Sequence, residues 1–355
     1  MRLWLWMTCA VVLASSAGAQ VDVDALRAFV EEEREAQKVP GLSIALVVED
    51  QLVWSEGFGF ADLESGQLAT GSTVYRIGSV SKPIVATALM QLVEQGKVDL
   101  DADIRTYVPE WPEKRWTITV RHLLTHTSGI RHYRGQEFLS REHYDDLVGP
   151  LSIFKDDELL FEPGSKFSYT TYGFNIVANI VENVSGQPIE QTMRAHVYGP
   201  AWMNDTGLES WTKLRKQRAR WYTRNGDGEL VNAPYVDLSN KYAGGGITAT
   251  VEDLARLHIA YARGKLMKPE TKELMFTPQT LNDGSRHVYG LGWAVQRVAL
   301  PDGETTRRIS HSGGSIGATT LYWSFPDRGL ALAIVTNIES NRGKILNGVL
   351  ERVLK

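Results

Sequence analysis

The chain has 355 residues, of which 43% are hydrophobic and 23% are charged, and its formal net charge at pH 7 is −4. This is the composition of an ordinary globular protein, and the length suits one large domain or two smaller ones. A core of this size needs neither a metal nor disulfides to fold. Because no polybasic run accompanies the negative net charge, nucleic acid is not expected as a partner.

The beginning of the chain has the features of a secretory signal peptide. Arg2 precedes a short apolar run, and Ala-Gly-Ala at 17–19 has the small residues of a signal-peptide cleavage site. The run is shorter than the roughly 20 apolar residues of a membrane span, so cleavage after Ala19 is favoured over retention as an anchor. We expect an exported protein, periplasmic or secreted, with no stable membrane span. The single cysteine, Cys9, lies in this segment, so a mature chain of 20–355 would have no disulfide and no thiol ligand.

The first elements of the mature chain are predicted to be two strands and a helix. Residues 41–62 contain two β-patterned runs joined by a polar turn at 49–50. Apolar residues then recur at helical spacing from 84 to 93. This helix is predicted to begin near Ser79 and to stop at Gly96.

The rest of the chain is predicted to be mostly helical and then β-patterned. Helices are expected after the capping residues Thr119 and Thr250, and four β-patterned runs lie between 289 and 338, followed by a helical pattern. Strands that open and close a chain are most simply joined in one antiparallel sheet with helices packed on it. The predicted fold class is therefore α/β of the α+β kind, one domain over 20–355, with a large, mainly helical lobe at about 97–285.

Ser79 and Lys82 form a candidate nucleophile and base. Residues three apart share one face of a helix, so the amine can reach the hydroxyl. Pro83 is best tolerated in a first helical turn, which places the pair at the helix start. A buried lysine with a lowered pKa can take the proton of such a serine. A serine cap beside a solvated lysine would give the same short pattern, so the motif needs support from elsewhere.

Two distant stretches supply that support. The sequence PGSKFSYTTYGFN at 163–175 places Tyr169 in a loop ahead of a helical run. In SHSGGSIGATT, at 310–320, a β-patterned run meets Gly313 and Gly314. Paired glycines let a substrate approach the backbone closely. The N–H of Gly314 could therefore join that of the nucleophile in holding an oxyanion.

These three motifs, in this order and spacing, resemble the serine β-lactamase and penicillin-binding-protein superfamily, most of all its class C and D-aminopeptidase/esterase branch. The stretches 118–130 and 243–257 look like further family signatures, and the resemblance covers about residues 25–350. Other short stretches are most similar to the mitochondrial β-lactamase-like members. The resemblance implies a β-lactamase/transpeptidase-like fold and a serine hydrolase that forms an acyl-enzyme. It implies no metal or other cofactor, and a small-molecule or peptide substrate.

The resemblance also implies roles for single residues. Ser79 is similar to the acyl-forming nucleophile, Lys82 to its activating partner, and Tyr169 to the tyrosine that transfers protons. His311 stands where the family has the first residue of a Lys-Thr-Gly motif, and Gly314 supplies the oxyanion N–H.

Two positions depart from the family pattern. Thr171 replaces an asparagine whose amide contacts the substrate, and a threonine offers only a hydroxyl. His311 replaces a permanently charged lysine and is neutral above its ordinary pKa of about 6.5, so it would gain charge only toward pH 6. Both changes weaken the case for a β-lactamase and leave the acyl-enzyme chemistry in place.

Several functions therefore stay open. The favoured one is an exported serine hydrolase acting on a peptide, a D-aminoacyl amide or an ester. A β-lactamase or D-alanyl-D-alanine carboxypeptidase is the alternative within the same fold. A catalytically silent binding protein is the alternative from another class, although Ser79, Lys82 and Tyr169 are all retained. A metallohydrolase is less favoured, because the pair His122 and His126 lacks the glutamate of a zinc motif and is expected to be structural.

Overall fold

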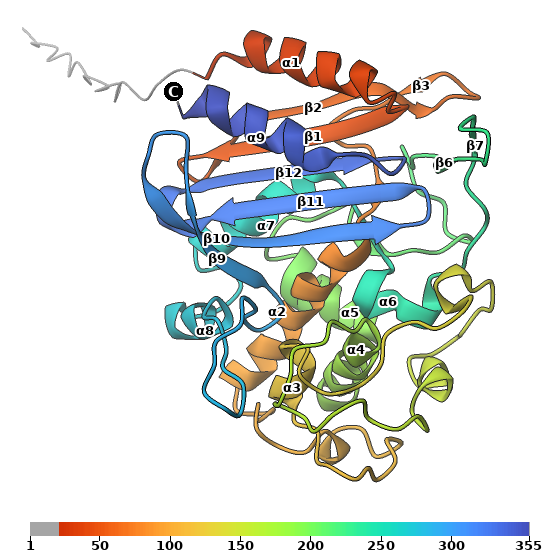
Figure 1. Ribbon diagram of the computed structural model, residues 1–355, viewed down its shortest axis with the longest axis vertical. Helices are drawn as coiled ribbons and strands as arrows, with labels where there is room; N and C mark the ends of the chain where they lie inside the picture. Colours follow the sequence, from red (N-terminus) through yellow and green to blue (C-terminus); the bar gives the residue numbers. More distant parts are fainter. Residues whose placement is uncertain (1–20, 355) are drawn as a thin grey trace, which may run out of the picture.

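The computed structural model describes residues 21–354, and its centre is a seven-stranded antiparallel sheet (Figure 1). The predicted signal segment and Cys9 lie outside the described residues. The strands are β1 (Gly41–Val48), β2 (Gln51–Asp62), β3 (Gln67–Leu68), β9 (Ala294–Ala299), β10 (Thr305–Ser315), β11 (Ala318–Phe325) and β12 (Leu330–Thr336). Their order is β3-β2-β1-β12-β11-β10-β9, so β1 pairs with β12 from the other end of the chain. The single sheet predicted from both chain ends is confirmed.

The hairpin between β1 and β2 turns at the predicted polar pair. Glu49 and Asp50 have φ values of 51° and 54°. A two-residue loop with both residues in the left-handed region matches the twist of the flanking strands. The hairpin therefore sets the register in which Val48 faces Gln51.

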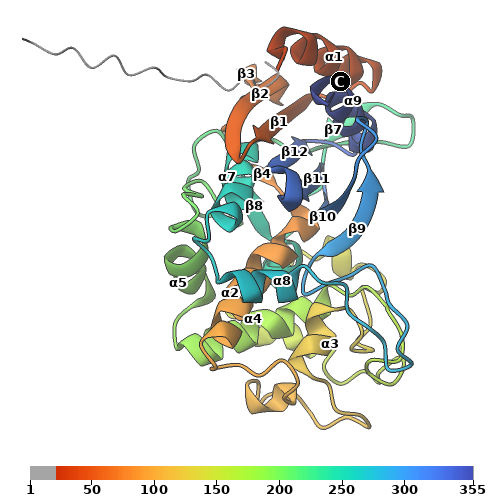
Figure 2. The ribbon, with the colours of Figure 1, turned by 90° about the vertical axis from the view of Figure 1, so that its left-hand side faces the viewer.

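Two terminal helices cover one face of the sheet, called the outer face below. They are α1 (Val23–Ala36) and α9 (Arg342–Val353), and they lie side by side above the sheet (Figures 1 and 2). Leu26, Val30 and Ile345 pack there against strand residues such as Leu332 and Ile334. Helix α9 was predicted from the sequence, and α1 was not.

The remaining helices lie on the opposite face, called the inner face. They are α2 (Ser81–Glu94), α3 (Val120–Leu124), α4 (Tyr172–Ser185), α5 (Ile189–Met193), α6 (Tyr242–Gly245), α7 (Val251–Ala262) and α8 (Pro269–Met275). The predicted caps are confirmed, because the Thr119 and Thr250 side chains accept N–H bonds at the starts of α3 and α7. The region also holds the small sheet β4 (Tyr75–Arg76), β8 (Ile247–Ala249), β5 (Gly207–Leu208). The hairpin of β6 (Tyr222–Arg224) and β7 (Leu230–Asn232) lies beside one end of the large sheet, where Tyr222 joins the outer-face cluster (Figure 1). The limits 97–285 of the predicted lobe stay a prediction.

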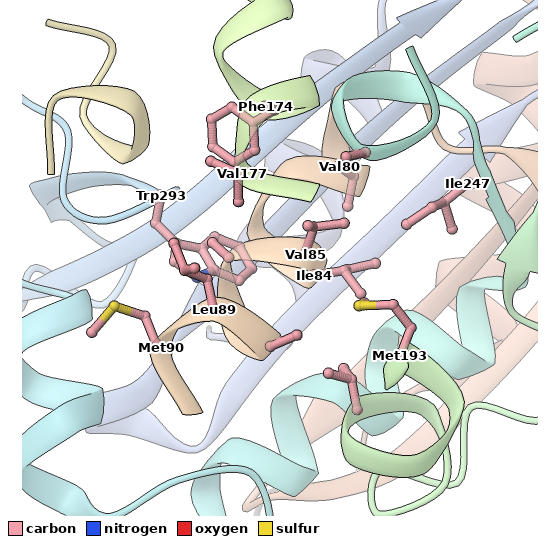
Figure 3. Packing of buried hydrophobic residues seen from close by; sticks show 14 of the residues in the cluster. Val80, Ile84, Val85, Leu89, Met90, Phe174, Val177, Met193, Ile247 and Trp293 are labelled. Atoms are coloured by element: carbon pink, nitrogen blue, oxygen red, sulfur yellow. The ribbon is translucent and has the colours of Figure 1, made fainter. Parts of the chain in front are cut away.

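Helix α2 is buried on nearly every side. Within one buried cluster, Ile84 lies on the side of Met193 and Ile247, whereas Leu89 lies toward Trp293 (Figure 3). The predicted apolar stripe was too narrow, since polar residues of this helix are buried as well. The predicted stop is confirmed: α2 ends at Glu94, and Gly96 has a φ of 69°. None of the helices between residues 21 and 354 is long and apolar enough to cross a membrane.

Candidate active site

Ser79 lies in a short 3₁₀ turn, η1 (Gly78–Val80), immediately before α2. The helix proper therefore begins two residues later than predicted, at Ser81. Gly78 has a φ of 51°, and a Cβ on it would stand 2.7–2.9 Å from backbone atoms of Gly314. A Cβ on Gly313 would stand 1.9 Å from the carbonyl oxygen of Ile77. These glycines allow the backbone of β10 to lie directly against the turn that carries Ser79.

The amine of Lys82 has three oxygen neighbours. Its Nζ lies 3.0 Å from Ser79 Oγ, 3.1 Å from Thr171 Oγ1 and 2.6 Å from the carbonyl oxygen of Gly244. The side chain is fully buried. Desolvation, and secondarily the positive charge of Lys241, lower the pKa of Lys82 well below its usual value.

This environment suits a neutral amine. A neutral lysine has two N–H donors and one lone pair, and Thr171 and Gly244 can accept the two N–H bonds. The lone pair then faces the hydroxyl of Ser79, which can donate its proton to it. Gly244 belongs to the AGGG stretch, and a Cβ on it would lie 2.3 Å from Thr171 Cγ2. The family-like stretch 243–257 thus contributes to the pocket that holds the lysine amine.

Tyr169 lies beside the same lysine. The Lys82 Nζ is 4.8 Å from the centre of the tyrosine ring. The tyrosine hydroxyl is buried without a hydrogen-bond partner at bonding geometry in the described chain. Burial raises the pKa of Tyr169 well above its usual value, and the neighbouring Ser79 hydroxyl opposes this shift. The three residues of the predicted catalytic set are therefore brought together.

His126 holds the loop that carries Tyr169. Its carbonyl accepts the N–H of Ser168, and its Nδ1 accepts the N–H of Thr170 at 3.2 Å. Its ring packs on that of Tyr169, with 4.2 Å between the centroids. The sequence analysis expected a structural role for His126, and these contacts agree with one. His122 likewise caps α3, since its Nδ1 accepts the N–H of Thr119.

The backbone of β10 beyond Ser310 has a free edge next to Ser79. Strand β9 pairs with β10 only as far as Ser310, whereas β11 pairs with it through Ser315. Hydrogen-bonded and non-hydrogen-bonded pairs alternate in an antiparallel ladder. The Ser315–Ala318 pair closes a two-residue loop and is a hydrogen-bonded pair, so the next pair, Gly314–Thr319, is a non-hydrogen-bonded one. The N–H of Gly314 is therefore directed away from β11, toward the edge where Ser79 lies.

His311 is buried and neutral rather than available as a cation. Its Nδ1 lies 2.7 Å from the carbonyl oxygen of Ser312 and must donate to it, so Nε2 accepts from the hydroxyl of Tyr289 at 2.7 Å. Burial, and then the charge of Lys82, lower the pKa of His311 to about 3. The expectation that His311 gains charge near pH 6 is therefore wrong. Its contact with substrate stays a prediction.

Thr171 is also occupied inside the protein. It is buried, and its hydroxyl accepts from Lys82. Its N–H donates to Nδ1 of His132 at 3.2 Å. The geometry therefore assigns Thr171 to the lysine pocket, and its predicted contact with a substrate stays a prediction.

A second buried lysine, which the sequence analysis did not identify, lies behind the site. Lys241 precedes α6, and its Nζ donates to the carbonyl oxygen of Phe138 at 2.6 Å, between the rings of Phe138 and Tyr133. Desolvation, and then the charge of Arg76, lower its pKa to about 7, whereas Glu209 acts in the opposite direction. A lone lysine in a loop gives no sequence signal for such a position. Among residues 21–354, no cluster of three or more potential metal ligands occurs.

The comparisons with known proteins agree with this geometry. The family model of the beta-lactamases matches residues 26–352. The chain belongs to the beta-lactamase family. The human serine beta-lactamase-like protein LACTB, mitochondrial, is 29% identical, over 90% of this chain and 77% of that protein. The fold and the class of serine hydrolase implied by the sequence motifs are thus confirmed.

Solved structures give the same result. The octameric penicillin-binding protein homologue from Pyrococcus abyssi is 27% identical with a TM-score of 0.77, covering 89% of this chain and 73% of its own. The D-amino acid amidase from Ochrobactrum anthropi SV3 is 22% identical with a TM-score of 0.79, covering 93% of this chain and 98% of its own. The second similarity supports the fold alone.

Proposed function

We propose that the chain is a serine hydrolase in which Ser79 forms an acyl-enzyme with a peptide, a D-aminoacyl amide or an ester. The observation that carries this proposal is the contact of 3.0 Å between Ser79 Oγ and the buried amine of Lys82. The Ser79 oxygen attacks the substrate carbonyl while its proton moves to Lys82. The tetrahedral oxyanion is held by the N–H groups of Ser79 and Gly314.

Collapse of that intermediate releases the amine or alcohol, which takes a proton through Lys82 and Tyr169. Water then attacks the acyl-enzyme with the same groups acting in reverse, and a carboxylic acid leaves. The Tyr169 hydroxyl suits this role because it is buried near Ser79 without a fixed partner among the described residues. The free edge of β10 supports a substrate with an extended backbone, since such an edge can pair with an added strand.

The site favours this function over that of a β-lactamase. A β-lactam or an acyl-D-Ala-D-Ala substrate carries a carboxylate that the family binds with a lysine, and here the position holds the neutral His311. The asparagine amide of the family is replaced by Thr171, whose hydroxyl is already bonded to Lys82. An unpaired polar group of a bound substrate costs about 1–3 kcal/mol, or roughly tenfold to a hundredfold in rate for each contact.

The test has two parts. A fluorophosphonate probe should label the peptide that contains Ser79, and Ser79→Ala should abolish labelling. With purified protein, kcat/KM for the best ester or aminoacyl amide should exceed that for nitrocefin by at least about a hundredfold. Labelling of another serine would refute the mechanism. A nitrocefin kcat/KM equal to that of the best ester would favour the β-lactamase instead.

We also propose that the protein is exported, which rests on the signal-like pattern ending at Ala19. A mammalian relative is named as mitochondrial, so the compartment must be measured directly. Protein recovered from its native compartment should begin at or near Gln20. A mature chain that retains Arg2 would contradict export with cleavage.

A further inference from the structure

His132 occupies a position at the edge of the site that no sequence motif indicated. It follows α3 in a loop that is bonded to Thr171, the residue before α4, and it is exposed to solvent. Its ring centre lies 5.8 Å from that of Tyr169 in an edge-to-face arrangement, and 4.2 Å from that of Tyr133. One side of this imidazole is therefore fixed against the proposed proton-transfer tyrosine, while another is open to solvent.

The hydrogen bond to Thr171 fixes which nitrogen of His132 carries the proton. A backbone N–H can only donate, and the N–H of Thr171 points at Nδ1 from 3.2 Å. Nδ1 is therefore an acceptor without a hydrogen. A neutral imidazole has one N–H, so the proton must be on Nε2. No group in the described chain accepts a bond from this Nε2, whereas Nδ1 is used.

The surroundings keep the ring neutral. Desolvation on its packed side, followed by the positive charges of Lys82 and Lys241, lower the pKa of His132 to about 4, and Glu137 acts in the opposite direction. At pH values above this pKa the imidazole is a neutral donor. A neutral donor suits a carbonyl oxygen better than a carboxylate.

We propose that His132 is a substrate-binding residue whose Nε2–H donates a hydrogen bond to an amide carbonyl oxygen in the acyl part of the substrate. The inference rests on the proposed function, because it takes Ser79 as the acylated residue. It also explains how the site can bind an amide although Thr171 has no side-chain amide. The ring of His132 is held by the backbone of Thr171 itself and lies beside that of Tyr169, with its Nε2–H unused by the described chain.

The test compares two p-nitrophenyl esters of equal chain length, the N-acetylglycine ester and the pentanoate ester. They differ in having or lacking the amide carbonyl, and the readout is the ratio of their kcat/KM values. His132→Phe keeps a ring against Tyr133 and removes the N–H, so the ratio should fall about tenfold, the factor expected for one hydrogen bond. His132→Gln retains an N–H donor and should restore most of the ratio. His196→Phe changes an exposed histidine outside the site and should leave the ratio as in the wild type.

The outcomes separate binding from structural support. If His132→Phe slows both esters equally, the residue only supports the loop and the proposal is overturned. Selective ¹⁵N-histidine NMR of the wild type gives a second readout that needs no variant: a proton on Nδ1 rather than Nε2 of His132 would also overturn it. Fluorophosphonate labelling of Ser79 in each variant distinguishes this failure from failure of the mechanism, which would appear as labelling elsewhere in the wild type too.

Discussion

The two faces of the seven-stranded sheet differ in the kinds of side chain that they bury. On the outer face, α1 and α9 enclose an aliphatic and aromatic cluster that includes Leu26, Ile345 and Leu332. On the inner face, near β10, the buried side chains include Lys82, Lys241 and other titratable groups. Burying an ionisable group costs free energy unless it is paired or neutralised, whereas burying an apolar one stabilises the fold.

This difference separates buried residues that stabilise the fold from buried residues that serve the proposed chemistry. The pKa of Lys82 is lowered and that of Tyr169 is raised by the same burial. Burial thus favours the neutral form of both groups, and a neutral amine beside a neutral phenol can exchange protons with Ser79. We expect substitutions of the buried ionisable residues near Ser79 to change rates, and substitutions in the apolar cluster of the outer face to change the free energy of unfolding.

The largest expected effect is the loss of the proton-transfer pair. Lys82→Met and Tyr169→Phe should each lower kcat by roughly 10²- to 10⁴-fold, and the double variant should be little worse than the poorer single variant, because members of one catalytic unit are not additive. The measurement is ester hydrolysis with each single and the double variant. Rate losses that multiply would show that the two residues act independently.

The thermal unfolding of the same variants checks the comparison between the faces. Lys82→Met replaces a desolvated amine with an apolar side chain of similar length, so it should not lower the melting temperature. A large loss of stability would mean that the buried Lys82 contributes to folding as well as to catalysis.

An outer-face substitution should have the opposite effect. Ile345 is fully buried between α9 and the sheet. Ile345→Ala should lower the free energy of unfolding by about 2–5 kcal/mol, through lost apolar burial and the cavity left behind. Denaturant unfolding measures this change. Ile345 does not contact the site, so the kcat/KM of the folded fraction should stay within about twofold of the wild-type value. A larger drop would show that the outer face and the site are energetically coupled.

The smallest expected effect is a shift in pH dependence. Below its pKa of about 7, Lys241 is positively charged and lowers the pKa of Lys82. Lys241→Met removes that charge, so the pKa of Lys82 should rise and the acid limb of the kcat/KM profile should move to higher pH, by about one unit or less for a charge at this range. A shift to lower pH would contradict the argument. Lys265→Met changes an exposed lysine and serves as the control.

The lowered pKa of Lys241 also predicts the direction in which the free energy of unfolding changes with pH. The pKa of Lys241 is about 7 in the folded chain and about 10.4 in an unfolded one, so the unfolded chain binds more protons between these values. The wild type should therefore gain stability as pH rises from about 7 to 10, and Lys241→Met should gain less. Equal slopes in both proteins would mean that Lys241 titrates normally.

Local patterns determined much of the fold. The two β-patterned runs of residues 41–62, the polar pair Glu49-Asp50 and the caps Thr119 and Thr250 act through short-range backbone geometry. Each appears in the structure where it was predicted. Helix α1 was missed, although it is amphipathic. Its neighbour α9 lies at the other end of the chain, and only their packing on the sheet defines that face.

For the site, the sequence by itself determined which residues could do the chemistry, because Ser79 and Lys82 share one helical turn and their spacing fixes their contact. Tertiary structure decided the rest. Contacts between segments distant along the chain set the position of Tyr169, the bond from Lys82 to the carbonyl oxygen of Gly244 and the orientation of His132. The charge states of Lys82 and His311 also depend on burial by those segments. Desolvation is a property of the packed surroundings and not of the residue, so no reading of single positions could have given it.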